Sequence, residues 1–174
     1  MKYYLIKELE GMQRPDIKNF NQTIDYRAFE EERFSSMSAR NVCVLNNTYD
    51  FGMLLLSPFP LFHSEMKKSL DLFWWDCKYK EFLFLDQKKR KSALYYLPFF
   101  LRIRGSIERK EQGKWFLNLR SEWPEDIPII YLKEEKNLQI VLRLDLLESL
   151  MRSGLCGVEL VPVQIKGGRE NGRS

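Results

Sequence analysis

Histidine is nearly absent from this sequence, in which His63 is the only one among 174 residues. The three cysteines, Cys43, Cys77 and Cys156, are far apart and form no Cys-x-x-Cys pair, so a zinc cage is not expected. The sequence also lacks the glycine-rich patterns that bind nucleotide phosphates, Gly-x-x-x-x-Gly-Lys-Ser/Thr and Gly-x-Gly-x-x-Gly. We therefore expect no metal site and no cofactor.

The lack of histidine also limits the catalytic chemistry that can be proposed. A single histidine acts as a general base only when a nucleophile and an orienting group lie within hydrogen-bond reach. His63 lies in a Pro-Phe-Pro-Leu-Phe-His segment just before a predicted helix, and we interpret it as structural or exposed. We predict no enzymatic activity. An enzyme with an unfamiliar carboxylate pair is an alternative, because 24 acidic residues always permit some pair.

Long apolar runs are missing as well. The first eight residues do not contain the apolar core of a signal peptide, and no segment approaches the roughly 20 apolar residues of a membrane-spanning helix. The lack of such apolar segments, together with three cysteines that are far apart in the sequence, is typical of a protein with reduced thiols. We expect a cytoplasmic location.

Aromatic residues are abundant, at 14% of the chain. Their large side chains easily supply a core, and the length is typical of one domain. We predict a single globular domain over residues 1–165 and a flexible tail over residues 166–174, which lacks an apolar anchor. The net charge of +4 comes from 28 basic and 24 acidic residues interleaved along the chain, so it says little about partners.

Predicted strands outnumber predicted helices. Glu8–Asn47 carries few apolar clusters, and we interpret it as irregular, with at most one short helix around Tyr26–Phe34. Short turns join most of the predicted strands, which indicates an α+β fold with a mostly antiparallel or mixed sheet and a few short packed helices. The predicted strands are Lys2–Lys7, Phe51–Leu56, Tyr79–Leu85, Ala93–Leu97, Phe99–Ile107, Lys114–Leu119, Ile127–Leu132, Leu138–Leu142 and Leu155–Val163.

One helix is predicted in the middle of the chain. Ser64 is a candidate N-cap, since a side-chain oxygen at that position can accept from the first free amides of the helix. Apolar residues follow at helical spacing and define one face: Met66, Leu70, Phe73 and Trp74.

A second helix is predicted over Asp145–Ser153. Asp145 and Glu148 have the spacing of a capping box, in which Asp145 accepts from first-turn amides while Glu148 reaches back. Gly154 stands where a left-handed C-cap belongs. The residues expected to be buried are Leu147, Leu150 and Met151.

The run Lys88-Lys89-Arg90-Lys91 is the clearest charge feature. It could contact phosphate while nearby aromatics stack on bases, or it could be a solvated hairpin turn with the aromatics in the core. The aromatics concerned are Phe82, Phe84, Tyr95 and Tyr96; further basic residues are Arg102, Arg104, Arg109 and Lys110. A nucleic-acid-associated protein is therefore an alternative to a protein-binding one. As candidate partner-binding residues we select Trp75, Arg90 and Trp123, which are large and near predicted element ends.

Three segments carry a resemblance to a known family. They are the opening Lys2-Tyr-Tyr-Leu-Ile6, the segment Pro60-Leu-Phe-His-Ser-Glu-Met-Lys-Lys-Ser-Leu70, and Leu138–Val163 with its ending Gly157-Val-Glu-Leu-Val-Pro-Val163. The chain resembles the immunity proteins of bacterial polymorphic-toxin systems, and among them the eleventh numbered immunity family, formerly a domain of unknown function. Glu8–Asn47 has no part in the resemblance. The resemblance implies a cytoplasmic protein that neutralises a cognate toxin by binding it, with no catalytic residues.

Overall fold

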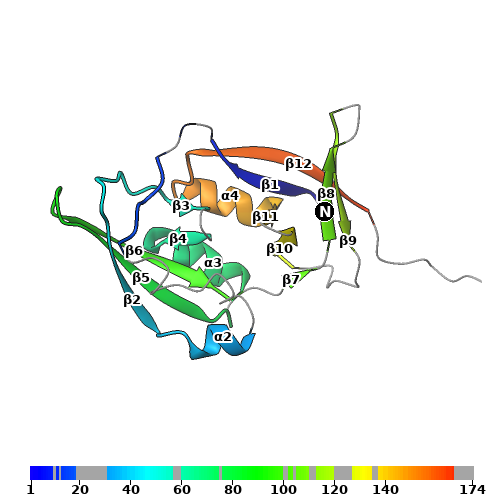
Figure 1. The fold of residues 1–174 in the computed structure, drawn as a ribbon. Helices are drawn as coiled ribbons and strands as arrows, with labels where there is room; N and C mark the ends of the chain where they lie inside the picture. The colour runs from blue at the N-terminus through cyan, green and yellow to red at the C-terminus, as the bar shows by residue number, and fades with distance from the viewer. Residues whose placement is uncertain are drawn as a thin grey trace, which may run out of the picture. The chain divides into compact units, whose positions relative to one another are not determined.

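The structure, a computed structural model, describes residues 1–9, 11, 13–18, 31–56, 60–74, 76–99, 102–103, 105–109, 113–119, 127–134 and 137–166. These residues form mixed sheets with a few short helices, so the predicted α+β class is confirmed. The chain divides into two compact units (Figure 1). Unit 1 comprises Met1–Lys7, Phe100–Ser149 and Val158–Ser174, and unit 2 comprises Glu8–Phe99 and Leu150–Gly157. The single domain over residues 1–165 stays a prediction. Of the predicted tail, Lys166 ends a strand and 167–174 lie outside the described residues.

The strands of unit 1 lie in the order β7-β10-β11-β1-β12-β9-β8. Strands predicted as neighbours joined by short turns form the antiparallel pairs β8–β9 and β10–β11. β7 pairs in parallel with β10, and β12 pairs in parallel with β9. The strand bounds are β1 (Tyr3–Glu8), β7 (Arg102–Ile103), β8 (Gly105–Arg109), β9 (Trp115–Leu119), β10 (Ile129–Glu134), β11 (Asn137–Arg143) and β12 (Val158–Lys166).

The sheet of unit 1 closes on itself. β7 and β8 are separated by a single residue in sequence yet stand at opposite ends of the strand order, so one stretch of chain pairs with both β10 and β9. Gly105 lies at this junction. A Cβ atom there would lie 2.6 Å from the Asn118 carbonyl oxygen and 3.0 Å from Leu132 Cδ2, so a side chain would be excluded by both neighbouring strands.

Alternate residues of these strands point into the closed sheet and form its core. Trp115 is partly buried against this core, and Lys7 Nζ lies 3.9 Å from the centre of its ring. The alternation has the period of two that strands impose. The core residues are Tyr3, Leu5, Leu117, Leu119, Ile127, Ile130, Leu132, Val141, Val161 and Val163.

The strands of unit 2 lie in the order β2-β5-β6-β4-β3. The predicted hairpin of β5 and β6 is its longest paired segment, from Tyr79↔Pro98 to Asp86↔Lys91. β2 runs parallel to β5, so the prediction that Glu8–Asn47 is irregular is wrong for this segment. The element bounds are α2 (Glu31–Ser36), β2 (Arg40–Val44), β3 (Leu54–Leu55), β4 (Leu61–His63), the 3-10 helix η2 (Ser64–Met66), α3 (Lys67–Phe73), β5 (Tyr79–Asp86) and β6 (Lys91–Pro98).

The predicted cap Ser64 is instead the first residue of η2, which is capped by His63, while α3 begins after Met66 without a side-chain cap. His63 Nδ1 accepts a hydrogen bond from the Glu65 amide at 3.3 Å, and its ring packs edge-on against Tyr95 with centroids 5.3 Å apart. An imidazole nitrogen can take the place of a hydroxyl oxygen as cap acceptor here because β4 delivers residue 63 directly into the first turn. Met66 and Leu70 are buried, as predicted.

α4 (Leu144–Arg152) begins one residue earlier than predicted. Its buried residues are Leu146, Leu147 and Leu150, whereas Met151, predicted to be buried, is 51% exposed. The Asp145 carboxylate binds Arg143 at 2.7 Å and the adjacent Leu146 amide at 2.9 Å, and no hydrogen bond from Glu148 completes a capping box among the described residues. Gly154 is left-handed at φ 96°, the predicted C-cap conformation.

Candidate interaction site on the sheet of unit 2

The side chains on one side of the β5–β6 hairpin belong to the core of unit 2. Phe82, Phe84 and Tyr95 are fully buried there, and the rings of Phe84 and Tyr95 meet edge-on with centroids 5.3 Å apart. The Tyr95 hydroxyl donates to the Gly52 carbonyl at 2.6 Å. Three of the four aromatics beside the basic run are therefore core residues, and only Tyr96 is partly exposed. This arrangement agrees with a solvated turn between two core strands.

The other side of the hairpin, which we call the outer face, is also apolar. We define it as Val42 and Val44 of β2, Leu83 and Leu85 of β5, and Leu94 of β6. Strand register aligns Val42 with Leu83 and Leu83 with Leu94, so the three side chains form one row across the sheet. Val42 is 56% exposed, and the other four are partly exposed. A solvated sheet face normally carries polar residues at these positions, so its apolar character requires an explanation.

Helix α3 covers only one end of this side of the sheet. Lys67 Nζ lies 4.6 Å from the centre of the Tyr79 ring and 5.7 Å from that of Tyr96. Asp71 accepts from Lys67 at 2.6 Å and from the Tyr79 hydroxyl at 2.8 Å, which fixes the helix over the two rings. Tyr79 and Tyr96 occupy the same side as Leu83, further from the β5–β6 turn. The outer face is the part of this side of the sheet that α3 does not cover.

Charged groups border the outer face at both ends. Arg40 Nε binds Glu81 Oε2 at 2.8 Å at the end nearer α3. At the opposite end lies the exposed turn Gln87–Arg90, followed by the exposed Lys91. The outer face is thus an apolar strip between an ion pair and a basic turn.

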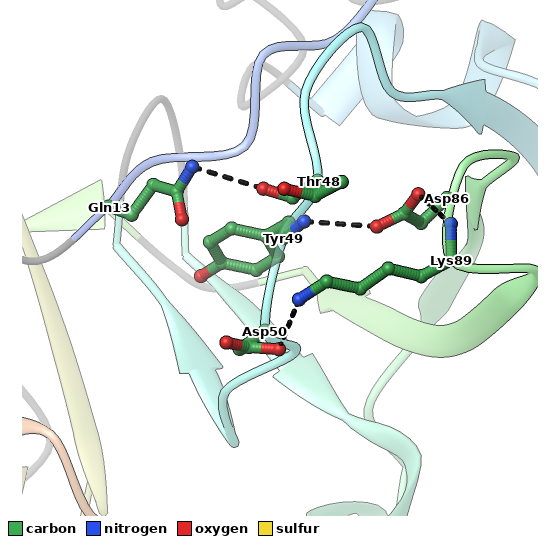
Figure 2. Close-up of polar contacts among 6 residues, drawn as sticks. All are labelled: Gln13, Thr48, Tyr49, Asp50, Asp86 and Lys89. Carbon is green, nitrogen blue, oxygen red and sulfur yellow. Dashed lines mark hydrogen bonds and ion pairs between the residues drawn. The ribbon is translucent and has the colours of Figure 1, made fainter.

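A buried carboxylate holds the basic turn in place. Asp86 is only 1% exposed, and its two oxygens accept from the Lys89 amide at 2.9 Å and from the Tyr49 amide at 3.1 Å (Figure 2). The Lys89 ammonium reaches back to Asp50 at 2.8 Å, so both ends of Lys89 are fixed. Gln13 donates to the Thr48 carbonyl at 3.0 Å and ties a third segment to the same loop. These contacts fix the conformation of the turn.

Acid should weaken this anchor. The Lys89 amide, with the Tyr49 amide and the Lys89 charge, holds the pKa of Asp86 below its usual range. A lowered folded-state pKa stabilises the fold above the unfolded value of about 3.9, and that contribution is lost as the pH falls through the folded pKa. We expect Asp86→Asn to be less stable than wild type at neutral pH, with the difference shrinking below about pH 4. Urea unfolding at several pH values measures this.

The exposed Asp76 supplies the control for that experiment, because it makes no hydrogen bond with the described residues. Asp76→Asn should leave the acid dependence of stability unchanged. A stability gap between Asp86→Asn and wild type that is equally large at neutral and acid pH would contradict the role given to the Asp86 charge.

Of the three candidate binding residues, Arg90 lies in the basic turn, is exposed, and has a φ of 52°. Trp75 and Trp123 lie outside the described residues. The outer face was not predicted. The unbroken apolar run Phe82-Leu83-Phe84-Leu85 is the signal that could have revealed it, because a strand with one solvated face should alternate with polar residues.

A cavity lies in unit 1 along β12. This cavity of about 930 Å³ is lined by residues of Met1–Tyr4, Gly113–Trp115 and Glu159–Ile165. Its charged lining side chains, Lys2, Lys114 and Glu159, are all exposed. Tyr3, a buried residue of the lining, donates its hydroxyl to the Ile127 carbonyl at 3.3 Å.

The described residues show neither a cysteine activated for nucleophilic chemistry nor a cluster of metal ligands. Cys43, Cys77 and Cys156 are free, and burial raises the pKa of the Cys43 and Cys77 thiols to about 11. A thiol with a raised pKa is a poor nucleophile at neutral pH. Within the described ranges no three potential ligands are grouped as a metal would require. None of the helices in those ranges is long and apolar enough to cross a membrane.

Comparisons with protein-family models, curated proteins and solved structures give no match.

Proposed function

We propose that this chain is a non-enzymatic binding protein of the bacterial cytoplasm, an immunity protein that neutralises a cognate toxin by direct contact through the outer face. The observation that supports this most is the apolar row of Val42, Leu83 and Leu94 on a solvent-facing side of the sheet. Leaving Val42 and part of Leu83 and Leu94 exposed to water has no benefit for folding, whereas covering them with a partner stabilises the complex.

The layout of the outer face matches that of a protein interface. Interfaces of standard size bury about 800 Å² per partner, with an apolar centre and a polar rim. Here the centre is the outer face, and the rim is formed by the Arg40–Glu81 pair and the basic turn. Binding of this kind needs no proton transfer, and His63 already uses its Nδ1 as a helix cap.

A nucleic-acid role has less support. The basic turn could contact phosphates, but single-strand binding also needs exposed aromatic rings on which bases stack. Phe82, Phe84 and Tyr95 are fully buried beside the turn and cannot serve in this way.

Placing a charge in the apolar row should abolish protection. We expect Val42→Lys and Leu83→Lys each to weaken binding of the toxin domain encoded by the adjacent gene by about 30-fold or more, the loss typical of a binding hot spot. A buried lysine without a partner is costly, and Val42 is exposed enough for the free protein to tolerate the change. Survival on co-expression with the toxin domain and titration calorimetry measure the effect.

Leu72→Lys is the matched control, since Leu72 is 79% exposed on α3 and outside the outer face. It should leave protection unchanged, and so should His63→Ala in a folded protein. If Leu72→Lys impaired protection as much as Val42→Lys, the outer face would not be the working surface. If only His63→Ala abolished it, a binding mechanism would be wrong.

A further inference from the structure

We infer that the partner of the outer face is a protein whose contact surface carries an apolar patch bordered by carboxylates, and that the basic turn pairs with these carboxylates. This inference rests on the proposed function and specifies the chemistry of its partner.

The charges of the basic turn are only partly balanced within the chain. Lys89 is neutralised by Asp50 at 2.8 Å, whereas Lys88 and Arg90 form no ion pair with the described residues. The Asp86 carboxylate is buried and occupied by backbone amides, so it does not reach these side chains. An excess of positive charge therefore remains at this end of the outer face.

The other end offers a second cation to a partner. The Arg40 side chain is largely exposed, and its ion pair with Glu81 runs through Nε. Its terminal nitrogens make no hydrogen bond with the part of the chain that is described. A guanidinium presented in this way binds carboxylates with a fork of parallel hydrogen bonds. Cations thus stand at both ends of the outer face, on either side of the apolar row.

The backbone of Arg90 gives an independent reason to assign its side chain a role. Arg90 is the only non-glycine residue with positive φ among the described residues. A left-handed conformation is unfavourable for arginine and costs glycine nothing, so the fold alone would favour glycine here. A strained residue whose side chain extends into solvent is a candidate for function.

The rim favours a protein over a nucleic acid. Asp50 is largely exposed, and Glu81 lies beside Arg40, so negative charge is interspersed with the cations. A continuous phosphate backbone would be repelled at these points, whereas a protein can place a cation or a neutral group opposite each of them. The apolar row between them likewise matches aliphatic side chains and gives no benefit to phosphate or sugar.

Arg90→Gly separates folding from binding. This variant should melt about 2–4 °C above wild type, because glycine relieves the left-handed backbone. It should nevertheless bind the purified toxin domain about tenfold more weakly at low salt, with a shallower salt dependence. Arg90→Lys should restore most of the affinity, since it restores the charge. Lys68→Gln, an exposed change on α3, should match wild type in affinity and salt dependence.

Binding to the toxin domain and to a short DNA duplex is measured over a range of NaCl concentrations. If the toxin bound with an affinity that salt and Arg90→Gly left unchanged while Val42→Lys abolished binding, the acidic partner would be wrong and the proposed function would stand. If the duplex bound more tightly than the toxin and Arg90→Gly abolished this, a nucleic-acid partner would replace it. If neither bound, both proposals would fall.

Discussion

Replacing Phe84 by alanine should lower the free energy of unfolding by about 3–5 kcal/mol, the range for removing a phenylalanine from a well-packed core. Phe84 is fully buried in the middle of β5, and its ring meets Tyr95 edge-on. Tyr95 also contacts Phe51 and His63, so the cavity would open at the centre of an aromatic cluster. Urea denaturation at neutral pH, followed by circular dichroism, measures the loss.

Leu83→Ala is the control for that prediction. Leu83 precedes Phe84 in the same strand but lies on the outer face, where its side chain is partly exposed. Its replacement should cost clearly less than that of Phe84, about 1–2 kcal/mol, because fewer atoms are removed and the site is partly open to solvent. Equal losses for the two variants would mean that the outer face is covered within the chain. The proposed interaction surface would then have no basis.

Replacing Leu150 by alanine should cost about 2–5 kcal/mol, because the side chain is 0% exposed and the helix backbone around it limits relaxation of the cavity. α4 has a matched control at the next position. Met151 is 51% exposed, so Met151→Ala should change the free energy of unfolding by less than about 0.5 kcal/mol. The two changes share a helix turn, and alanine is favourable at both positions.

Urea denaturation of the two variants and of wild type gives the midpoints and slopes from which the free energies of unfolding are compared. A small loss at Leu150, or a large one at Met151, would place the apolar face of α4 elsewhere. Such a result would mean that α4 is rotated about its axis relative to the orientation given above.

Local patterns predicted the hairpins well. β5–β6, β8–β9 and β10–β11 join neighbours in sequence, so the strand pattern and the polar turn between them hold most of the information. The α4 terminus was predicted for the same reason, since Gly154 marks its end within one turn. Met151 was assigned wrongly because three apolar residues at helical spacing do not fix which of them lies at the edge of the buried stripe.

The parallel strand pairs leave no local signal in the sequence. β2 pairs with β5, β7 with β10 and β9 with β12, and each pair joins segments separated by other elements. β2 reads Arg-Asn-Val-Cys-Val, with polar residues at its start, and its strand conformation depends on hydrogen bonds to β5 rather than on its own composition. Missing β2 also concealed the outer face, because Val42 completes the apolar row only in that pairing.

The candidate site was predicted in part. The basic turn was visible in the sequence as four consecutive basic residues, and Arg90 was selected from them. The anchoring role of Asp86 was not visible, since its partners Tyr49 and Lys89 come from two separate segments. A carboxylate just before a turn is common in sequences, and only the fold shows which amides it binds.

β1 lies between β11 and β12 in the closed sheet of unit 1, and it pairs Tyr3 with Arg143. During translation, β1 therefore cannot pair with β11 or β12 until most of the chain has left the ribosome. All of β2–β6 is synthesised before that point. Closing so long a loop is slow, whereas the β5–β6 hairpin needs only local contacts. We expect the hairpin to gain amide-exchange protection early in refolding and β1 to gain it last, together with β12.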